Sequence, residues 1–356
     1  MKNMKHLLAL VALLLCTGNI RAYQVTYQPQ DSVKVERLLC DARKAKRISN
    51  PVIYFARQLL GLPYVAHTLE VNDNEQLVVN LRQLDCTTYV ENVVALTMCL
   101  QQGQYRFKDF CDNLLTIRYR KDCKPQYVSR LHYFTEWITD NTCKGLCREI
   151  QQPVPPFTAW QQIKVGFMSA HPEKYKMLKA HPEDIPAIAN TEKALNKLKF
   201  RYIPKSKIGN TKLLRQTIHN GDILALTTKL DGLDIQHIGF AVWHKDGLHL
   251  LNASSLRHKV VEEPKTLSAY LQKQKSMTGV RVVRLAPSIL PEGREQLVVL
   301  ALGAHRDAQT VVAQRHISAV AHHDALTFQI VVNGGGIGHL GQKEIGIGGI
   351  YRLADR

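Results

Sequence analysis

The order in which two hydrophobic periodicities follow one another constrains this fold most. Residues 33–61 show a helical pattern, and the runs "FKDFCDNLLTIRY" and "SRLHYFTEWITDN" continue a helix-rich half. From Gly221 onward the runs "GDILALTT", "IQHIGFAVW", "LHLLNAS" and "VRVVRL" are short, β-rich and separated by turn residues. Helices followed by an antiparallel sheet predict an α+β fold.

Turn and cap residues set boundaries within this pattern. Asn50 can cap a helix that has Pro51 in its first turn and Gly61 as its stop. The break "QQPVPPF" begins a polar, lysine-rich stretch with several prolines, residues 151–210. We expect this stretch to be an excursion over the core rather than part of it, inserted in a domain that spans residues 23–286.

The first 22 residues have the pattern of a secretory signal peptide. Lys2 and Lys5 precede an apolar run, residues 7–15, and Ala22 offers a small residue for cleavage. The run is shorter than the roughly 20 apolar residues of a membrane span, and no later stretch qualifies. The sequence therefore predicts export to the periplasm or cell envelope. A lipid anchor on Cys16 is the less favoured alternative, because Leu15 occupies a position where a small residue is expected.

Residues 287–356 differ from the rest of the chain in composition. Lys343 is their only lysine, cysteine is absent, and glycine is clustered. His322, His323 and Asp324 are adjacent, but a cluster without a spaced partner is typical of a solvated loop rather than a metal site. The triple glycine lacks the strand, helix and acidic residue of a dinucleotide site. The origin of this tail stays open, including an appended or misframed segment.

Composition and charge exclude other classes of protein. A chain of 356 residues with 45% apolar side chains can bury a large core. The net charge of +17 would suit a polyanionic partner, but lysine and arginine are scattered and no nucleic-acid-binding motif accompanies them. We therefore expect no nucleic-acid partner.

Cysteine usage argues against structural zinc. Removal of Cys16 leaves seven of the eight cysteines, so at least one is unpaired or pairs between molecules. The spacing of Cys143 and Cys147 lacks a second pair at zinc-finger distance. We expect no metal and no cofactor.

Cys86 is the candidate nucleophile, because it stands at the expected start of a helix. The side chains of Val90, Val93, Val94 and Thr97 recur at helical spacing and predict an amphipathic helix. Near its N-terminus, the helix dipole and free amide groups would stabilise a thiolate.

The cap of this helix has two candidates. Asp85 is a good N-cap residue, and Thr88 with Glu91 offers an alternative capping box. Either choice leaves Cys86 in or beside the first turn. Cys99 lies inside the helix and has no comparable activation.

The strands supply a candidate base and orienting group. Strand alternation puts His237 on the same face as Gly239. If the hairpin loop is residues 244–247, Asn252 lies opposite Gly239 and diagonal to His237, within reach of the imidazole. A two-residue loop would instead place Asn252 opposite Ala241.

The motifs "GLPYVAH", "LDCTTYVE", "NGDILAL", "QHIGFAVW" and "LLNAS", in this order, resemble the NlpC-type branch of papain-like cysteine hydrolases. More closely, the chain resembles exported bacterial proteins described as N-acetylmuramoyl-L-alanine amidase-like. The segments "SRLHYFTEWITDN", "FMSAHP" and "RYIPKSKI" also fit that family, so the resemblance covers residues 33–285. It implies a papain-like fold and peptidoglycan or muropeptides as the partner.

The resemblance also implies roles for five residues. Cys86 would be the nucleophile, His237 the general base, and Asn252 the group that orients the imidazole. Tyr64 would help the oxyanion or be an ordinary core tyrosine. Asp85 would bind a substrate amine or, as we favour, cap the helix. The family pattern has "DCSG" where this chain has "DCTT", and often histidine in place of Asn252, which bears on the substrate pocket.

The sequence thus predicts a cysteine-dependent peptidoglycan amidase that cuts between N-acetylmuramic acid and L-alanine. One alternative is an endopeptidase that cuts the stem peptide after γ-D-glutamate. A catalytically silent wall-binding protein and a metal-dependent hydrolase that uses the tail histidines are the others.

Overall fold

The computed structural model describes residues 23–287, 329–331 and 337–339, and the chain divides into two compact units, residues 1–287 and 288–356. In the second unit, β11 (Gln329–Val331) pairs antiparallel with β12 (Ile337–His339). The predicted signal peptide, Cys16 and the cluster of His322, His323 and Asp324 lie outside the described residues. No described helix is both long and apolar enough to cross a membrane.

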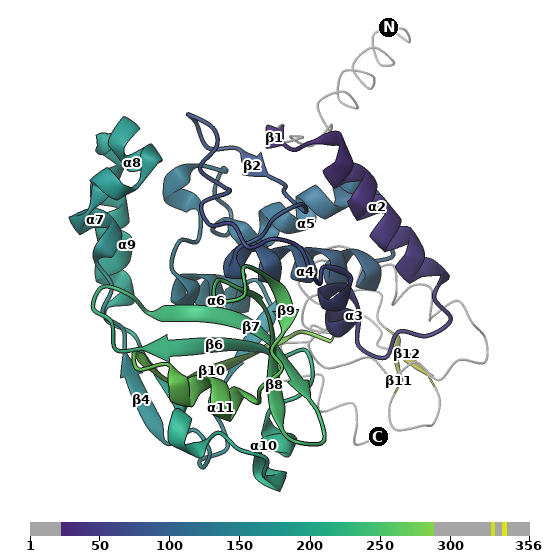
Figure 1. Ribbon diagram of the computed structural model, residues 1–356. Helices are drawn as coiled ribbons and strands as arrows, with labels where there is room; N and C mark the ends of the chain where they lie inside the picture. Colours follow the sequence, from purple (N-terminus) through teal and green to yellow (C-terminus); the bar gives the residue numbers. More distant parts are fainter. Residues whose placement is uncertain (1–22, 288–328, 332–336, 340–356) are drawn as a thin grey trace, which may run out of the picture. The chain divides into compact units, whose positions relative to one another are not determined.

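The first unit is built on an eight-stranded sheet whose strands all pair antiparallel. Its order is β4-β5-β10-β6-β7-β8-β9, and β3 also pairs with β10 (Figure 1). The strands are β3 (Cys147–Ile150), β4 (Ala159–Gln162), β5 (Lys199–Pro204), β6 (Ile223–Thr228), β7 (Ile235–Trp243), β8 (Leu248–Ser254), β9 (Lys259–Glu262) and β10 (Met277–Leu285). A short parallel pair, β1 (Val25–Thr26) and β2 (Leu77–Val78), lies apart from this sheet.

Helices lie on both sides of the sheet, and the antiparallel pairing, with α2 to α6 preceding the sheet strands in the chain, gives an α+β architecture. On one side lie α2 (Pro29–Lys44), α3 (Pro51–Gln58), α4 (Cys86–Gln101), α5 (Phe107–Arg118) and α6 (Phe134–Cys143) (Figure 1). On the other side lie α10 (Lys212–Thr217) and α11 (Leu267–Lys273). Single 3₁₀ turns form η1 (Tyr127–Ser129), η2 (Pro172–Lys174), η3 (Pro182–Asp184) and η4 (Lys205–Lys207).

The start of α3 follows the predicted cap. Asn50 Oδ1 accepts a hydrogen bond from the Ile53 amide at 3.0 Å, and Pro51 occupies the first turn. The helix ends at Gln58, and Gly61 follows with φ +82°, a backbone conformation that favours glycine. The chain turns there and leads toward Tyr64.

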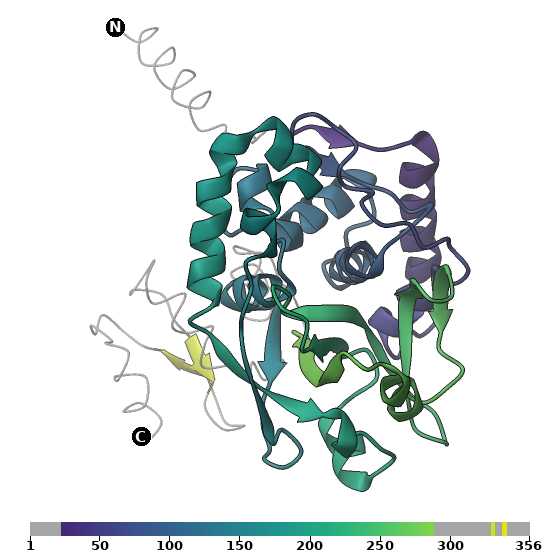
Figure 2. The ribbon, with the colours of Figure 1, turned by 60° about the vertical axis from the view of Figure 1, so that its left-hand side comes forward.

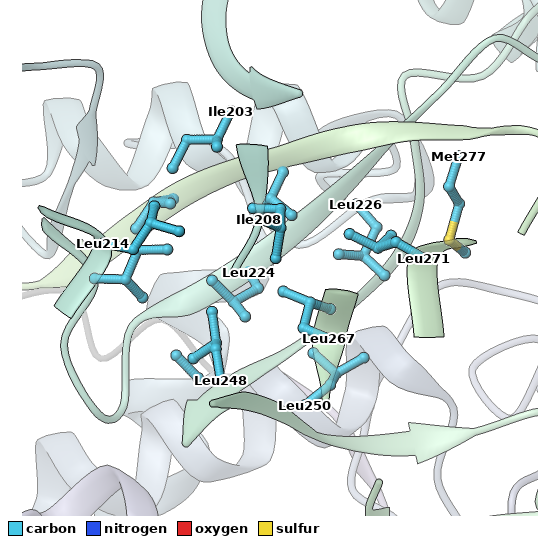
Figure 3. Packing of buried hydrophobic residues seen from close by; sticks show 14 of the residues in the cluster. Ile203, Ile208, Leu214, Leu224, Leu226, Leu248, Leu250, Leu267, Leu271 and Met277 are labelled. Carbon is cyan, nitrogen blue, oxygen red and sulfur yellow. The ribbon is translucent and has the colours of Figure 1, made fainter. Parts of the chain in front are cut away.

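One apolar cluster lies between the sheet and α10 and α11. Figure 3 shows how side chains from β6, β8 and α11 interlock there, Leu224, Leu250 and Leu271 among them. Ile203 and Ile208 belong to the same cluster although they come from the lysine-rich stretch. Burial of these apolar surfaces stabilises this side of the sheet.

The lysine-rich stretch, residues 151–210, is part of the core, and the expectation of a mere excursion is wrong. Its strands β4 and β5 extend the sheet, and β5 pairs with β10. The helices α7 (Phe167–Ala170), α8 (Lys176–Ala180) and α9 (Ile185–Leu195) stack at one edge of the unit (Figure 2). They build a second apolar cluster, which includes Met168, Leu178 and Leu195. The many exposed lysines hid this short apolar pattern.

The helix α4 is buried on every side, so the expected amphipathic pattern is also wrong. Every residue from Thr88 to Cys99 is buried. The helix packs against α3 and α5 and, on its other side, against β7 and β8, where the Tyr89 ring meets Phe240 at 5.7 Å. Glu91 forms a buried ion pair with Arg118 at 2.7 Å. A helix that is enclosed in this way holds its first turn in a fixed position.

Candidate active site

Cys86 is the first residue of α4, and Asp85 is the N-cap residue. Asp85 Oδ1 accepts from the Thr88 amide at 2.8 Å, and the Asp85 amide donates to Thr88 Oγ1 at 3.0 Å. The predicted cap at Asp85 is therefore confirmed. The alternative capping box of Thr88 and Glu91 does not form, because Glu91 forms an ion pair with Arg118. The amides of Cys86 and Thr87 are the first of the helix and have no carbonyl partner within it.

The surroundings of the Cys86 thiol favour its protonated form. Burial is the main cause that raises its pKa to about 12, and the Asp85 carboxylate adds to the effect. Hydrogen bonds from the Ile238 backbone and the Thr87 side chain act in the opposite direction. The resting site therefore does not hold the thiolate that a helix start alone would suggest, and the nucleophile needs a base to take its proton.

His237 and Asn252 form the hydrogen bond that the sequence predicted. His237 Nε2 lies 2.7 Å from Asn252 Oδ1, and because an amide oxygen only accepts, Nε2 carries the proton. Asn252 Nδ2 donates to the carbonyls of Val261 at 3.3 Å and Leu250 at 3.4 Å, which fixes the amide orientation. Nδ1 is then the basic atom of the His237 ring.

Burial also keeps the His237 imidazole neutral. The side chain is 7% exposed, and burial lowers its pKa below the ordinary value of 6.5. The hydrogen bond to Asn252 and the charges of Glu263 and Asp85 oppose this shift. A neutral imidazole can act as a general base at neutral pH.

The register of β7 and β8 places Asn252 opposite Gly239. Trp243 pairs with Leu248, so the loop between the strands is residues 244–247, as in the first predicted register. A side chain at Gly239 would clash, because a Cβ there would lie 2.8 Å from Asn252 Cβ and 2.7 Å from the Leu251 carbonyl oxygen. Glycine therefore leaves the space across which Asn252 reaches His237.

A β-bulge precedes the base. Leu226 pairs with His237 and Thr227 pairs with Ile235, so Gln236 is the extra residue on β7. Its Oε1 accepts from Thr228 Oγ1 at 2.9 Å and from Ser276 Oγ at 2.8 Å. Bulges of this kind redirect the next side chain, and this one sits directly beside the candidate base.

Two backbone hydrogen bonds between residues 63–65 and Leu84 hold Tyr64 close to Cys86. The Leu84 amide donates to the Pro63 carbonyl at 3.0 Å, and the Val65 amide donates to the Leu84 carbonyl at 3.1 Å. Burial raises the pKa of Tyr64 to about 12, and the nearby Cys86 and Asp85 contribute. The phenol therefore keeps its proton and can donate a hydrogen bond near the nucleophile.

Cys86 and His237 both line one cleft of about 610 Å³. The cleft is also lined by Phe167 and Tyr175 of the inserted segment and by His132. The loop between β6 and β7, residues 230–234, forms another side. Sequence reasoning missed these residues, since the segments meet only in the folded chain; the only hint was that "FMSAHP" and "SRLHYF" fit the resemblance.

Buried carboxylates hold the walls of the cleft in place. Glu192 of α9 accepts from Tyr133 Oη at 2.6 Å and from the Met168 amide at 3.1 Å. Asp234 accepts from the Thr135 amide at 2.6 Å, which ties the loop to the start of α6. These bonds fix the cleft before a ligand binds.

The other cysteines and potential metal ligands are simple to place. The structure contains no disulfide among the seven cysteines from Cys40 to Cys147; Cys99, Cys111 and Cys147 are buried and Cys40, Cys123 and Cys143 exposed. Within the described ranges, no group of three or more histidine, cysteine, aspartate or glutamate side chains could hold a metal ion.

A thiol beside helix-start amides, in one cleft with a neutral imidazole that an amide orients, is suited to acyl transfer. The imidazole can take the thiol proton, and the amides of Cys86 and Thr87 can stabilise an oxyanion.

Comparisons with known proteins relate the chain to amidase-like proteins. Residues 54–280 match the model of the AmiA-like family, described as N-acetylmuramoyl-L-alanine amidase-like. An N-acetylmuramoyl-L-alanine amidase from Bacteroides uniformis is 35% identical over 66% of this chain and 97% of its own, with a TM-score of 0.61. A Bacteroides fragilis protein, provisionally named a xylanase, is 43% identical over 64% of this chain and 98% of its own, with a TM-score of 0.59.

A third solved structure shares the fold alone. This protein from Legionella pneumophila is 20% identical over 73% of this chain and 96% of its own, with a TM-score of 0.55. No curated protein matches the chain.

Proposed function

The chain belongs to the N-acetylmuramoyl-L-alanine amidase-like family, and from that premise we propose that it is a cysteine-dependent peptidoglycan amidase. It is an exported enzyme of the NlpC-type papain-like class, active in the periplasm or cell envelope, and it cuts between N-acetylmuramic acid and L-alanine. The observation that carries the proposal is the 2.7 Å bond between His237 Nε2 and Asn252 Oδ1, with His237 in the same cleft as Cys86 at a helix start.

The reaction begins from a neutral thiol and a neutral imidazole. His237 Nδ1 takes the Cys86 proton as Sγ attacks the carbonyl carbon of the lactyl group. The amides of Cys86 and Thr87 stabilise the oxyanion of the tetrahedral intermediate. Protonated His237 then donates to the nitrogen of L-alanine, the C–N bond breaks, and the stem peptide leaves with a free amine. The muramyl group stays on Sγ as a thioester.

Hydrolysis of the thioester completes the turnover. His237 Nδ1 takes a proton from water as the water oxygen attacks the thioester carbonyl. The intermediate collapses, Sγ leaves and recovers its proton from His237, and the lactyl carboxylate is released. Throughout both steps, Asn252 holds the imidazole in one plane by accepting from Nε2.

The xylanase name of one relative finds no support in the cleft. A glycoside hydrolase needs two carboxyl groups that face the scissile bond. The carboxylates that line this cleft are Asp231 and Asp234, and Asp234 is 2% exposed and bound to the Thr135 amide. The nucleophile and base of the amidase proposal occupy the same cleft.

Trapping the covalent intermediate tests the proposal. Acid quenching during turnover, followed by intact-mass and peptide mass spectrometry, should show a muramyl adduct on the peptide that contains Cys86. An adduct of L-alanyl-γ-D-glutamate would instead identify an endopeptidase. Absence of any adduct, together with activity that EDTA abolishes, would refute the cysteine mechanism in favour of a metal-dependent one.

Alkylation separates an enzyme from a silent wall-binding protein. Iodoacetamide at neutral pH should modify Cys86 faster than the buried Cys99 and Cys111, because His237 can assist only Cys86. The exposed Cys40 serves as an internal reference whose rate should not change in a His237→Ala variant. Inertness of Cys86 in the wild type would favour the silent protein.

A further inference from the structure

Strands β4 and β5 form an antiparallel ribbon at one end of the sheet order, and its two faces differ. Trp160 pairs with Arg201. The pairing continues past the strand ends, because the Ile163 amide donates to the Leu198 carbonyl at 3.1 Å. Alternate residues of a strand point to opposite faces. One face of the ribbon, here called the Trp160 face, therefore carries Trp160, Gln162, Lys164, Lys197, Lys199 and Arg201.

The opposite face of the ribbon is apolar and packs inward. Ile163 belongs to the apolar cluster of the inserted segment, and Leu198 and Phe200 pack against that cluster. The same cluster contains Met168, which lines the cleft beside Cys86. The Trp160 face therefore points away from the cluster that borders the cleft.

Water reaches most of the Trp160 face. Trp160 itself is 48% exposed. Arg201 Cζ lies 4.4 Å from the centroid of the indole ring, and Lys199 Nζ lies 4.9 Å from it. The other polar side chains of the face are exposed as well: Gln162, Lys164 and Lys197. The face thus combines a half-exposed aromatic ring with cations stacked on it.

No carboxylate neutralises these cations. Residues 193–221 contain six lysines and two arginines but no aspartate or glutamate, and residues 150–172 also lack an acidic side chain. Asp231 and Lys164 both line a hollow of about 690 Å³, but they form no ion pair. Within the described part of the chain, none of the four cations of the Trp160 face has an ion-pair partner. Lysines that look scattered in the sequence are therefore gathered on one surface.

Such a face suits a layer of negative charge better than a single anion. Side chains on one face of a strand are about 7 Å apart along it, so these cations are spread too widely to converge on a small ion. Tryptophan with lysine and arginine is the combination that is enriched where proteins meet the membrane–water interface. A peptidoglycan stem carries amino groups beside its carboxylates, so it offers the face a less uniform negative charge than a layer of lipid phosphates.

We propose that the Trp160 face is a peripheral membrane-binding surface that takes a bilayer rich in anionic phospholipids. Its four cations bind lipid phosphates, and the indole of Trp160 enters the headgroup layer. The binding is reversible, because a few surface charges and one aromatic ring hold a bilayer far more weakly than a membrane span does. The contact leaves the apolar cluster beside the cleft uncovered. This inference does not depend on the proposed amidase function.

Vesicle sedimentation with the full-length protein tests this surface. The probes are vesicles of phosphatidylcholine alone and vesicles of equal parts phosphatidylcholine and phosphatidylglycerol. The protein should bind only the anionic vesicles well, and less so as the salt concentration rises. The double variant Lys197→Gln with Lys199→Gln should bind them about 25-fold more weakly, because each lysine near an anionic surface contributes about fivefold.

The double variant Lys44→Gln with Lys46→Gln is the matched control. These two lysines are exposed, have the same spacing and do not lie on the Trp160 face. The control should change the binding less than about twofold, since charges beyond a Debye length of the bilayer are screened. Residues 1–22 are present in every variant, so differences between variants do not come from them. Circular dichroism checks that each variant is folded.

Tryptophan fluorescence gives a second readout. The chain has three tryptophans. Trp137 is 1% exposed, and Trp243 Nε1 donates to the Ile218 carbonyl at 2.7 Å, so we expect neither to respond to vesicles. Anionic vesicles should shift the emission of the wild type to shorter wavelength, and the shift should be absent in Trp160→Phe.

Four outcomes would overturn the membrane-binding surface. They are no binding to anionic vesicles, equal binding to both kinds of vesicle, equal losses in the two double variants, and an emission shift that persists in Trp160→Phe. Purified peptidoglycan sacculi provide the competing partner. If the protein binds sacculi through Lys197 and Lys199 and binds neither kind of vesicle, the face belongs to the wall polymer and the membrane proposal is wrong.

Discussion

In the proposed mechanism, Asn252 contributes without touching the reacting atoms. It is fully buried, and its amide is held by two backbone carbonyls while Oδ1 accepts from His237. The sequence predicted this pair because an even-length hairpin loop puts both residues on one face of the sheet. It could not predict the bulge at Gln236, since a bulge depends on the pairing of β7 with β6.

Replacement of Asn252 should lower kcat much more than it changes KM. In Asn252→Ala the imidazole is free to tilt, and a misplacement of about 1 Å costs on the order of 10²-fold. Asn252→His should retain part of the activity, because imidazole can also accept from Nε2. Steady-state kinetics measure both variants, with Cys86→Ala as the fully inactive reference. Wild-type rates in Asn252→Ala would contradict the assigned role.

Gly239 offers a test of the space between the two strands. Gly239→Ala would put a Cβ 2.8 Å from Asn252 Cβ and force that side chain or its strand to move. We expect kcat to fall by about 10- to 100-fold, close to the Asn252→Ala value, with a smaller effect on KM. The double variant should be little worse than either single variant, because both remove the same orientation. If the kcat losses of the two single variants add up in the double variant, Gly239 does not act through the position of Asn252.

The pH dependence of kcat/KM follows from the pKa values of the Cys86 thiol and the His237 imidazole. His237 must be unprotonated to act as the base, so activity is full above its pKa and is lost as pH falls through it. Because burial lowers that pKa, the acid limb should lie below pH 6.5. The Cys86 pKa of about 12 predicts no loss from the thiol up to about pH 10. A preformed thiolate–imidazolium pair would give a bell-shaped profile with an alkaline limb, which a pH–rate series would reveal.

Among the elements, α4 sets the position of Cys86, the proposed nucleophile. The sequence predicted its start from Asp85, because a cap is a local feature. It did not predict that Glu91 would be buried as well, since its partner Arg118 comes from α5. Similarly, the lysines of the inserted segment concealed that it contributes two strands and one wall of the cleft.

Loss of the buried ion pair of α4 should destabilise the fold strongly. Glu91→Ala leaves the Arg118 guanidinium, which is 2% exposed, without its carboxylate. Breaking one partner of such a pair costs about 3–5 kcal/mol. Urea unfolding followed by circular dichroism should show this loss, whereas Lys108→Ala, which removes the exposed pair with Asp112, should cost under about 1 kcal/mol. Equal effects would mean that α4 is not held by Glu91.

The molecule as a whole brings together segments that are far apart in the chain. Cys86 comes from the helical half, His237 and Asn252 from the sheet, and Tyr175 from the inserted segment. The α+β order, the helix start at Cys86 and the pairing of His237 with Asn252 could be predicted from the sequence, because each rests on a local pattern or on one hairpin. The cleft could not, because it forms where three distant segments meet.

The bond that is cut tests the central claim most directly. Purified peptidoglycan fragments of defined structure are digested with the wild type and with Cys86→Ala, and the products are identified by mass spectrometry. We predict that the wild type releases free N-acetylmuramyl sugar and intact stem peptides that begin with L-alanine, and that Cys86→Ala releases neither. Release of L-alanyl-γ-D-glutamate from fragments with a free amino terminus, or the same products from both proteins, would contradict the account.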